Sequence, residues 1–283
     1  MKIAITGATG FLGGSLKEFL NLNDHTVLGI STKDDNFITK VSEFKPDVFI
    51  HCAWIGGSSY GDTQDLIQYE NISDGVKVFK ALNKNKKVKF IGFGSFSEYG
   101  IVDDVIEESF LENPSSLYGI SKNSFKEMSK SFCDFKNFDW LWIRPCYIYG
   151  PNDVATRLIP KVIKDCLEKK EVVLNSCQSV VDYLYIDDFV RAIHELIVQN
   201  KHGVYNICSG EQYIVKDIVS HIGDICNFNN ITYDSKRDRV NFPKKICGSR
   251  QKLTFETGWK PEVEIVDGLK KTIEHKRKLS NFL

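Results

Sequence analysis

The chain opens with Met1-Lys2-Ile3-Ala4-Ile5-Thr6-Gly7-Ala8-Thr9-Gly10-Phe11-Leu12-Gly13, and this stretch decides the fold. An apolar run, Lys2–Thr6, predicts a strand, and the residues from Phe11 to Leu20 predict an amphipathic helix. Glycine permits a tight turn between them and leaves no side chain between the backbone and a pyrophosphate. The free amides and the dipole of the helix start attract an anion. The stretch therefore predicts a dinucleotide-binding turn over an ordinary strand–helix turn, contacted by Gly7, Thr9, Gly10, Phe11, Leu12 and Gly13.

Short apolar runs alternate with longer amphipathic stretches through the first half of the chain. Further strands are expected at Thr26–Ile30, Asp47–Cys52, Val88–Phe93 and Trp140–Arg144. The helices between them are expected at Ile38–Phe44, Asp65–Leu82 and Ser116–Phe132. Short strands rich in Val, Ile and Phe fit a sheet that is covered on both faces. The pattern predicts an α/β fold with a doubly wound parallel (Rossmann) sheet.

After Gly150-Pro151 the rhythm becomes less regular and predicts a smaller C-terminal α/β substrate-binding portion. Its expected helices are Val154–Glu168, one beginning near Asp187, Val215–Ile225 and Val263–His275, and its expected strands are Val172–Leu174, Val180–Ile186 and Gly203–Ile207. We therefore expect a dinucleotide-binding domain over 1–150, which also takes in about 181–208. Residues 151–283 then form mainly the substrate-binding portion.

The composition excludes several classes of protein. Of 283 residues 42% are hydrophobic, and 37 basic residues balance 37 acidic ones, so no overall positive field attracts nucleic acid or an anionic membrane. No apolar stretch approaches the roughly 20 residues that span a bilayer, and glycine comes too early for a secretory signal. The 8 cysteines include no Cys-x-x-Cys pair, and the 6 histidines lack metal-ligand spacing. We expect reduced thiols, a cytoplasmic location and no metal.

Two lysine-rich stretches, Lys84–Lys89 and His275–Lys278, are expected to be solvated.

The end of the second strand indicates which dinucleotide binds. An acidic residue there hydrogen-bonds the ribose hydroxyls of NAD, whereas a 2′-phosphate repels it. This strand ends in Ser31-Thr32-Lys33, whose hydroxyls and cation suit a phosphate. NADPH is therefore favoured over NADH or NAD, although Asp34 and Asp35 follow closely and keep the alternative open.

Two further segments carry groups suited to acid–base chemistry. Tyr118 and Lys122 lie four residues apart on a predicted helix, which places both side chains on one face. A tyrosine begins near pKa 10, so acid–base work at neutral pH needs its pKa lowered by about 3 units, which a nearby ammonium favours. Ser95 follows the strand that ends at Phe93, where ligands bind in open α/β sheets.

Together these motifs resemble the extended short-chain dehydrogenase/reductases, specifically the NAD-dependent epimerase/dehydratase group that acts on nucleotide sugars. The resemblance is carried by Gly7–Gly13, Lys45–His51, Asn71, Ser95–Gly100, Tyr118 with Lys122, Arg144-Pro145, Tyr149–Pro151, Asp182–Asp188, Tyr205–Ile207 and Gly258–Pro261. It implies that Tyr118 donates or accepts the proton, Lys122 lowers its pKa and holds the nicotinamide ribose, and Ser95 bonds the reacting oxygen. It also implies cofactor contacts at Cys52, Ala53, Asn71 and Pro145, and a homodimer that uses the helix Ser116–Phe132.

Departures from sister patterns narrow the reaction. Dehydratases of the group carry an Asp-Glu pair where this chain has Phe96 and Ser97, so dehydration is disfavoured. Relatives similar to GDP-fucose synthase epimerise with a Cys and a His, where this chain has Ser97 and Asn152. The remaining choices are an NADPH-dependent reductase of the C4 keto group of a nucleoside-diphosphate 4-keto-6-deoxy sugar (hexose or heptose) and a redox-neutral 4-epimerase with bound NAD. A sensor that only binds a dinucleotide is a third reading, against which the retained Tyr118 and Lys122 argue.

The substrate side is expected to use several scattered residues. His51-Cys52-Ala53-Trp54 resembles the corresponding segment of reductases for 4-keto-6-deoxy sugars, which makes Trp54 a candidate beside Phe96, Ser97 and Asn152. Many relatives have an Arg that grips the substrate pyrophosphate where this chain has Val181. Another cation must replace it, and Arg157 and Arg250 are the candidates. The nucleotide (GDP, CDP, dTDP or UDP), the sugar and the stereochemistry at C4 are left open.

Overall fold

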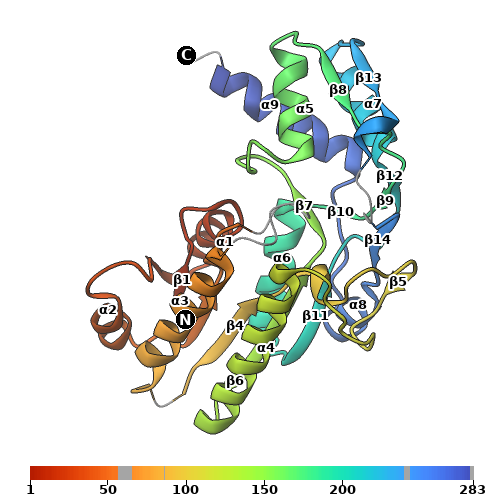
Figure 1. The fold of residues 1–283 in the computed structure, drawn as a ribbon. Coiled ribbons are helices and arrows are strands. Elements are labelled where there is room, and N and C mark those ends of the chain that lie inside the picture. The colour runs from red at the N-terminus through yellow and green to blue at the C-terminus, as the bar shows by residue number, and fades with distance from the viewer. Residues whose placement is uncertain (57–65, 86, 239–242, 281–283) are drawn as a thin grey trace.

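The structure is a computed structural model that describes residues 1–56, 66–85, 87–238 and 243–280. Its centre is a six-stranded parallel sheet with the strand order β11-β6-β4-β3-β1-β2 (Figure 1). The strands are β1 (Lys2–Thr6), β2 (Thr26–Ile30), β3 (Val48–His51), β4 (Lys89–Phe93), β6 (Asp139–Pro145) and β11 (Gly203–Ile207). This arrangement confirms the expected doubly wound parallel sheet.

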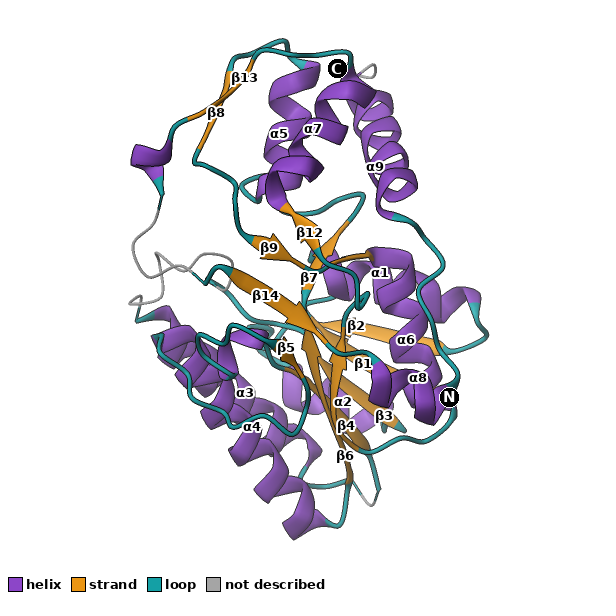
Figure 2. Cartoon of the chain, turned by 90° about the vertical axis from the view of Figure 1, so that its right-hand side faces the viewer, coloured by secondary structure: helices purple, strands orange, loops and turns teal. Residues whose placement is uncertain are grey.

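Helices cover both faces of this sheet, as Figure 2 shows. Alternate residues of β1 explain why both faces are apolar: Ile3 and Ile5 belong to one core cluster, and Ala4 belongs to the other. The first cluster includes residues of α1 (Phe11–Leu22) and α6 (Ile186–Val198). The second includes residues of α2 (Phe37–Phe44), α3 (Ile67–Leu82) and α4 (Leu117–Lys136).

The bounds expected for the first half agree with the observed elements to within a few residues. Two strands, Lys2–Thr6 and Thr26–Ile30, are observed as expected. The helix expected over Asp65–Leu82 is observed from Ile67, and residue 65 lies outside the described residues. The helix expected to end at Phe132 continues to Lys136 and ends at Asn137, which has a left-handed backbone (φ 53°).

The second half folds into a smaller portion that lies beyond the sheet (Figures 1 and 2). Its helices are α5 (Leu158–Leu167), α7 (Val215–Cys226) and α9 (Ile265–Ser280), and the short α8 (Gln251–Thr257) packs against β11. Small sheets complete it. One pairs β8 (Val172–Leu174) with β13 (Ile231–Tyr233), and another pairs β7 (Tyr147–Tyr149) with β10 (Tyr183–Tyr185). A further sheet has the strand order β12 (Tyr213–Ile214), β9 (Val180–Val181), β14 (Lys245–Gly248) and β5 (Val105–Ile106).

Two expectations for this half were wrong in detail. The helix expected from Val154 begins at Leu158, because residues 151–157 form a loop. The run Val180–Ile186 is not one strand: it divides at Asp182 into β9 and β10, which pair with different partners. The buried carboxylate of Asp182 accepts bonds from Ser209 N and Gly210 N, at 2.8 and 2.9 Å. These bonds explain why the strand is divided at Asp182, because they tie its side chain to the loop that follows β11.

Residues 186–207 return to the main sheet after the chain has entered the smaller portion. Helix α6 packs beside α1, and β11 pairs with β6 from Gly203↔Leu141 to Ile207↔Pro145. The edge strand opposite β2 is therefore supplied by a late segment of the chain. Within the described residues, no helix has the length and apolar character needed to cross a membrane.

Lys89 corrects the expectation that the lysines from Lys84 to Lys89 are solvated. It is buried, and its ammonium donates to the carbonyls of Lys201 and Leu196 at 2.6 and 3.3 Å and to Asn200 Oδ1 at 3.3 Å. Burial lowers the pKa of Lys89 to about 8. The end of α6 and the residues after it thus supply the oxygens that bind this ammonium. The sequence around Lys89 does not predict them.

Candidate active site

The turn after β1 is built so closely that only glycine fits at two positions. A Cβ at Gly13 would lie 2.3 Å from the carbonyl oxygen of Gly7. A Cβ at Gly7 would lie 2.8 Å from the backbone nitrogen of Ala53, and Gly7 also has a left-handed backbone (φ +71°). The turn and the end of β3 are therefore in direct backbone contact.

Helix α1 begins at this turn with its amides available. Gly10 is its N-cap and makes no side-chain capping bond. The side chains of Phe11 and Leu12 pack partly buried against the core, so only their backbone amides remain for a ligand at the turn. Thr9 lines the adjacent cavity. These features fit the anion-binding turn that the glycine spacing predicts.

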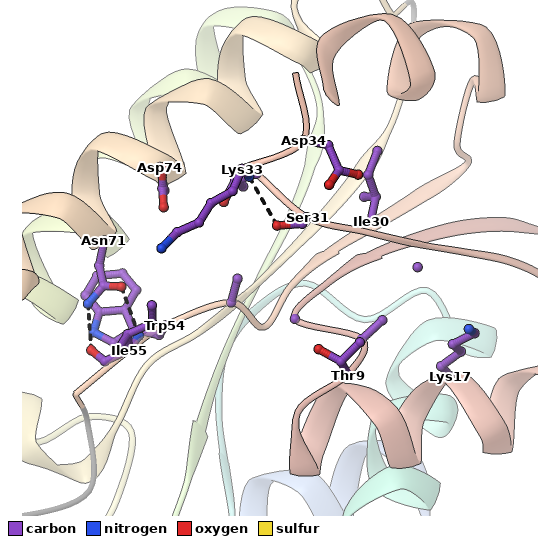
Figure 3. A pocket seen from close by; sticks show the side chains of 15 residues that line it. Thr9, Lys17, Ile30, Ser31, Lys33, Asp34, Trp54, Ile55, Asn71 and Asp74 are labelled. Atoms are coloured by element: carbon purple, nitrogen blue, oxygen red, sulfur yellow. Dashed lines mark hydrogen bonds between the residues drawn. The ribbon is translucent and has the colours of Figure 1, made fainter. Parts of the chain in front are cut away.

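A cavity of about 360 Å³ extends from the turn to the end of β2 (Figure 3). Ser31, Thr32 and Lys33 line it together with Thr9 and Ala53. Ser31 Oγ accepts a bond from Lys33 N at 3.1 Å, and Thr32 is buried. The structure thus brings residues proposed for the pyrophosphate and for the adenosine end of a dinucleotide into one cavity.

Lys17 also lines this cavity, and the sequence reasoning missed it. Its side chain lies along β2, since a Cβ at Gly29 would be 3.6 Å from Lys17 Nζ. Lys17 stands four residues after Gly13, one helical turn further along α1. Helical spacing could have pointed to it, because residues i and i+4 share a face.

The carboxylates near the cavity are paired, whereas two lysines are not. Asp34 forms an ion pair with Lys40 at 3.5 Å, and Asp74 forms one with Lys77 at 2.7 Å. Among the described residues, Lys17 and Lys33 have no carboxylate within ion-pair distance. The cavity therefore presents two ammonium groups without a carboxylate partner.

The loop after β3 is held by buried polar groups. Thr6 Oγ1 lies 2.8 Å from His51 Nδ1 and accepts from Ala53 N at 3.3 Å, and Cys52 N donates to Thr6 O at 3.3 Å. Asn71, from α3, accepts from Ile55 N at 2.9 Å and donates to Ile55 O at 2.8 Å. Cys52, Ala53 and Asn71 thus meet at one loop, with Asn71 fixing its backbone.

Ser95, Tyr118 and Lys122 come together beyond the carboxyl end of β4. Ser95 is the N-cap of a short 3-10 helix (Phe96–Glu98), and its hydroxyl is close enough to Tyr118 to affect the pKa of the phenol. Ser116 caps α4 by accepting from Gly119 N at 3.1 Å, which places Tyr118 in the first turn of α4. Lys122 is buried and donates to the carbonyl of Phe93 at 2.7 Å.

The electrostatics of this group differ from the expectation. Burial raises the pKa of Tyr118 to about 12, and the nearby Ser95 hydroxyl and the positive charge of Arg157 only partly oppose this. Burial lowers the pKa of Lys122 to about 7, against the carboxylate of Glu98, which favours the charged amine. The chain's own groups therefore hold Tyr118 protonated at neutral pH.

A buried charge network supports Ser95 and was not foreseen. Glu98 is fully buried and accepts from Ser95 N at 2.8 Å and from Arg144 Nε at 2.7 Å. Arg144 also donates to Tyr99 Oη at 2.7 Å and pairs with Glu112. Burial raises the pKa of Glu98, while Arg144 opposes this shift. No local signal marks this pair, because 46 residues separate its members.

Three residues proposed for the substrate side lie close to this group. Ser97 Oγ accepts from Ser95 Oγ at 3.2 Å. The ring of Trp54 lies under Lys122, with its centroid 3.9 Å from the ammonium. Phe96 is buried in a small core cluster with Tyr99, in edge-to-face contact at 5.8 Å between ring centroids. Phe96 therefore contributes packing contacts beside this group.

The other substrate candidates and Pro145 take varied positions. Arg157 pairs with Asp153 at 3.3 Å and acts electrostatically on Tyr118. Asn152 is exposed and contacts His275 of α9 at 3.1 Å. Arg250 donates to the carbonyl of Ser209 and lies 3.9 Å from Glu211. Pro145 ends β6, opposite Ile207 of β11.

Known proteins share this architecture along the whole chain. A GDP-6-deoxy-D-mannose reductase from Pseudomonas aeruginosa is 24% identical over 95% of each chain. The solved structure of a Bacillus cereus UDP-glucuronic acid 4-epimerase with UDP-glucuronic acid and NAD matches with a TM-score of 0.87 and 25% identity, covering 99% of this chain and 100% of that one. The structure of RMD from P. aeruginosa with NADPH matches with a TM-score of 0.86 and 20% identity, covering 98% and 99%.

Other curated relatives include a GDP-L-colitose synthase from Yersinia pseudotuberculosis and dTDP-glucose 4,6-dehydratases. Residues 3–208 match the sequence pattern of one enzyme family, and this span contains the glycine turn, Ser95, Tyr118 and Lys122. The fold and the motifs agree with that match. The chain belongs to the NAD dependent epimerase/dehydratase family.

Proposed function

We propose that this chain is an NADPH-dependent reductase of the C4 keto group of a nucleoside-diphosphate 4-keto-6-deoxy sugar (a hexose or heptose), which supplies deoxysugar precursors for polysaccharides. One observation carries the proposal: Ser95, Tyr118 and Lys122 converge, and Lys122 contacts Trp54, which lines the cavity at the glycine turn. Full-length similarity to a GDP-6-deoxy-D-mannose reductase supports the reaction class.

The residues present fit a dinucleotide. The close backbone contact at Gly7 and Gly13 leaves amides, rather than side chains, to receive the pyrophosphate. Ser31, Thr32 and Lys33, which line the cavity with Ala53 and Asn71, would hold the adenosine end. Ala53 and Asn71, together with Cys52 and Pro145, would border the rest of the cofactor. When bound, NADPH supplies the hydride.

The charge of the cavity supports NADPH over NADH. Asp34 stands near the end of β2, where a carboxylate would favour NAD, but Lys40 is paired with it. Lys17 and Lys33 remain for a 2′-phosphate, to which an ammonium binds through charge-assisted hydrogen bonds.

The protonation state of Tyr118 favours reduction. With a pKa raised to about 12, the phenol is protonated at neutral pH and can donate to the alkoxide that develops at C4. Ser95, oriented by the Glu98 bond to its backbone, would stabilise the same oxygen. Charged Lys122 would then stabilise the tyrosinate left behind.

A redox-neutral 4-epimerase with bound NAD is the second candidate, which the likeness to the UDP-glucuronic acid 4-epimerase favours. Such an enzyme begins by oxidising its sugar and therefore needs the tyrosinate first. Dehydration remains disfavoured, because Phe96 is buried in packing contacts and Ser97 is bonded to Ser95.

The assay mixes purified protein with NADPH and 4-keto-6-deoxy sugars linked to GDP, CDP, dTDP or UDP. We expect loss of nicotinamide absorbance with one of them and a turnover lower by about 10²–10⁴-fold for Tyr118→Phe, with NADPH binding retained. Absence of oxidation with every sugar, together with interconversion of UDP-sugars by bound NAD, would establish the epimerase instead.

We further propose that residues 1–150 with about 181–208 form the cofactor domain, and that Arg157 or Arg250 binds the substrate pyrophosphate. A homodimer through α3 and α4 is supported by exposed apolar side chains on these adjacent helices, namely Tyr69, Ile120 and Met128. Light scattering should then give about twice the 32.3 kDa mass of the chain. A monomeric mass at micromolar concentration would contradict it.

A further inference from the structure

Trp54 contacts the buried ammonium of Lys122 through the face of its indole. The ring centroid lies 3.9 Å from Lys122 Nζ, well within the range of a cation–π interaction. The same nitrogen lies 5.9 Å from the centroid of the Tyr118 ring. One of its three hydrogens is donated to the carbonyl of Phe93 at 2.7 Å. The indole and this carbonyl therefore fix two sides of the ammonium.

The indole is itself held by a buried amide of α3. Trp54 Nε1 donates to Gln68 Oε1 at 2.8 Å, and Gln68 is fully buried. Gln68 Nε2 donates to the carbonyl of Gly56 at 2.9 Å. Together with the two bonds from Asn71 to Ile55, these contacts fix the loop that carries Trp54 (Figure 3 shows Asn71, Trp54 and Ile55 side by side).

We propose that Trp54 is a positioning residue for Lys122: its ring face keeps the ammonium charged and directed toward Tyr118, and Gln68 sets the orientation of that ring. This inference rests on the proposed function in one respect, namely that charged Lys122 stabilises the tyrosinate of Tyr118. It reassigns Trp54 from the sugar to the catalytic lysine. The Trp54 ring also packs against Phe125 of α4, with 5.9 Å between the ring centroids.

The charge of Lys122 is sensitive to such a contact because the group is buried. Burial lowers the pKa of Lys122 to about 7, while Glu98 and Cys52 favour the charged form. The facing groups also include the neutral ring of His51, whose pKa is lowered to about 3. Near pH 7 a fall of about one unit would reduce the charged fraction from about half to about a tenth.

The test measures the ionisation of Lys122 directly, in the cofactor-free protein, by an NMR titration of lysines labelled at Cε. A Lys122→Met sample identifies the resonance. We expect Trp54→Leu to lower the pKa of Lys122 by about one unit and Trp54→Phe to lower it less, since a smaller aromatic face is retained. Gln68→Leu, which frees the indole N–H, should move the pKa in the same direction.

Trp140→Leu is the matched control. Trp140 is a buried tryptophan of β6 whose N–H donates to Ser129 Oγ at 2.9 Å, so its loss weakens packing without touching Lys122. An unchanged pKa in both Trp54→Leu and Gln68→Leu would overturn the inference, as would an equal fall in Trp140→Leu. A fall restricted to the Trp54 and Gln68 variants supports it, even if the wild type oxidises NADPH with no sugar, a result that would refute the proposed function alone.

In the active enzyme the same change should appear in the pH profile. Because charged Lys122 is the working form, the alkaline limb of kcat/KM should move to lower pH by about one unit in Trp54→Leu. A variant that only loosened the fold would lower the whole profile without shifting the limb. Retention of the wild-type limb would contradict the inference.

Discussion

Lys17 and Lys33 are the residues through which the proposed preference for NADPH can be tested. They come from different elements, α1 and the end of β2, and both line the cavity proposed for the adenosine end (Figure 3). The chain places Gly29 beneath Lys17, where a Cβ would lie 2.8 Å from the side chain of Ala8. A residue without a side chain at that point leaves room for the lysine to lie over β2.

Replacement of either lysine should weaken binding of NADPH more than binding of NADH. We expect Lys33→Ala and Lys17→Ala each to raise the Kd for NADPH by roughly tenfold or more, because a charge-assisted bond to the 2′-phosphate contributes about 1.5–3 kcal/mol. Fluorescence titration with each dinucleotide measures this. Lys80→Ala is the control, since Lys80 is an exposed lysine of α3 outside the cavity. Equal losses for NADPH and NADH would contradict a 2′-phosphate contact.

At the scale of elements, most of the main sheet was predictable because its signal is local. Runs such as Lys2–Thr6 and Gly203–Ile207 carry their own apolar pattern and became strands with the expected bounds. Strands of two residues, such as β5 and β12, exist only through distant partners and leave no such pattern.

The candidate site divides in the same way. The glycine turn, Ser95, Tyr118 and Lys122 stand in recognisable motifs. Glu98, buried against Arg144, and Trp54, under Lys122, acquire their contacts only when the fold closes. Lys17 could have been found from helical spacing, but the pairing of the nearby Asp34 with Lys40 is seen only in the structure.

His51 links the ends of β1 and β3 and should make stability depend on pH. It is buried against Thr6, and burial lowers its pKa to about 3, whereas the unfolded chain titrates near 6.5. Below pH 6.5 only the unfolded state takes up this proton, so the group costs stability as the pH falls.

Between pH 7 and 5 the wild type should therefore lose about 2 kcal/mol more unfolding free energy than His51→Asn, which retains a partner for Thr6 without titrating. Urea unfolding at both pH values gives the two differences. Because Asp182 and the other buried acids are common to both proteins, their contributions cancel. Parallel loss in the two proteins would show that His51 is not the group responsible.

The whole molecule is interleaved, since the chain crosses between the sheet and the smaller portion repeatedly. It leaves the sheet after β6, returns through α6 and β11, and leaves again through β12 and α7. Asp188 at the start of α6 also accepts bonds from Glu262 and Val263, which precede α9. Neither portion therefore has a continuous segment that could unfold and leave the other intact.

This interleaving predicts one cooperative thermal transition that cofactor binding moves as a unit. NADPH at about 100 times its Kd should add about 2.7 kcal/mol to the free energy of unfolding, which for a chain of this size raises Tm by about 5 °C or more. Scanning calorimetry measures the midpoint, and circular dichroism and tryptophan fluorescence should report the same value. NADH at equal concentration should raise Tm less, because Lys17 and Lys33 lack a 2′-phosphate to bind. Two separate transitions, of which NADPH moves one, would mean that the portions unfold independently despite the shared chain crossings.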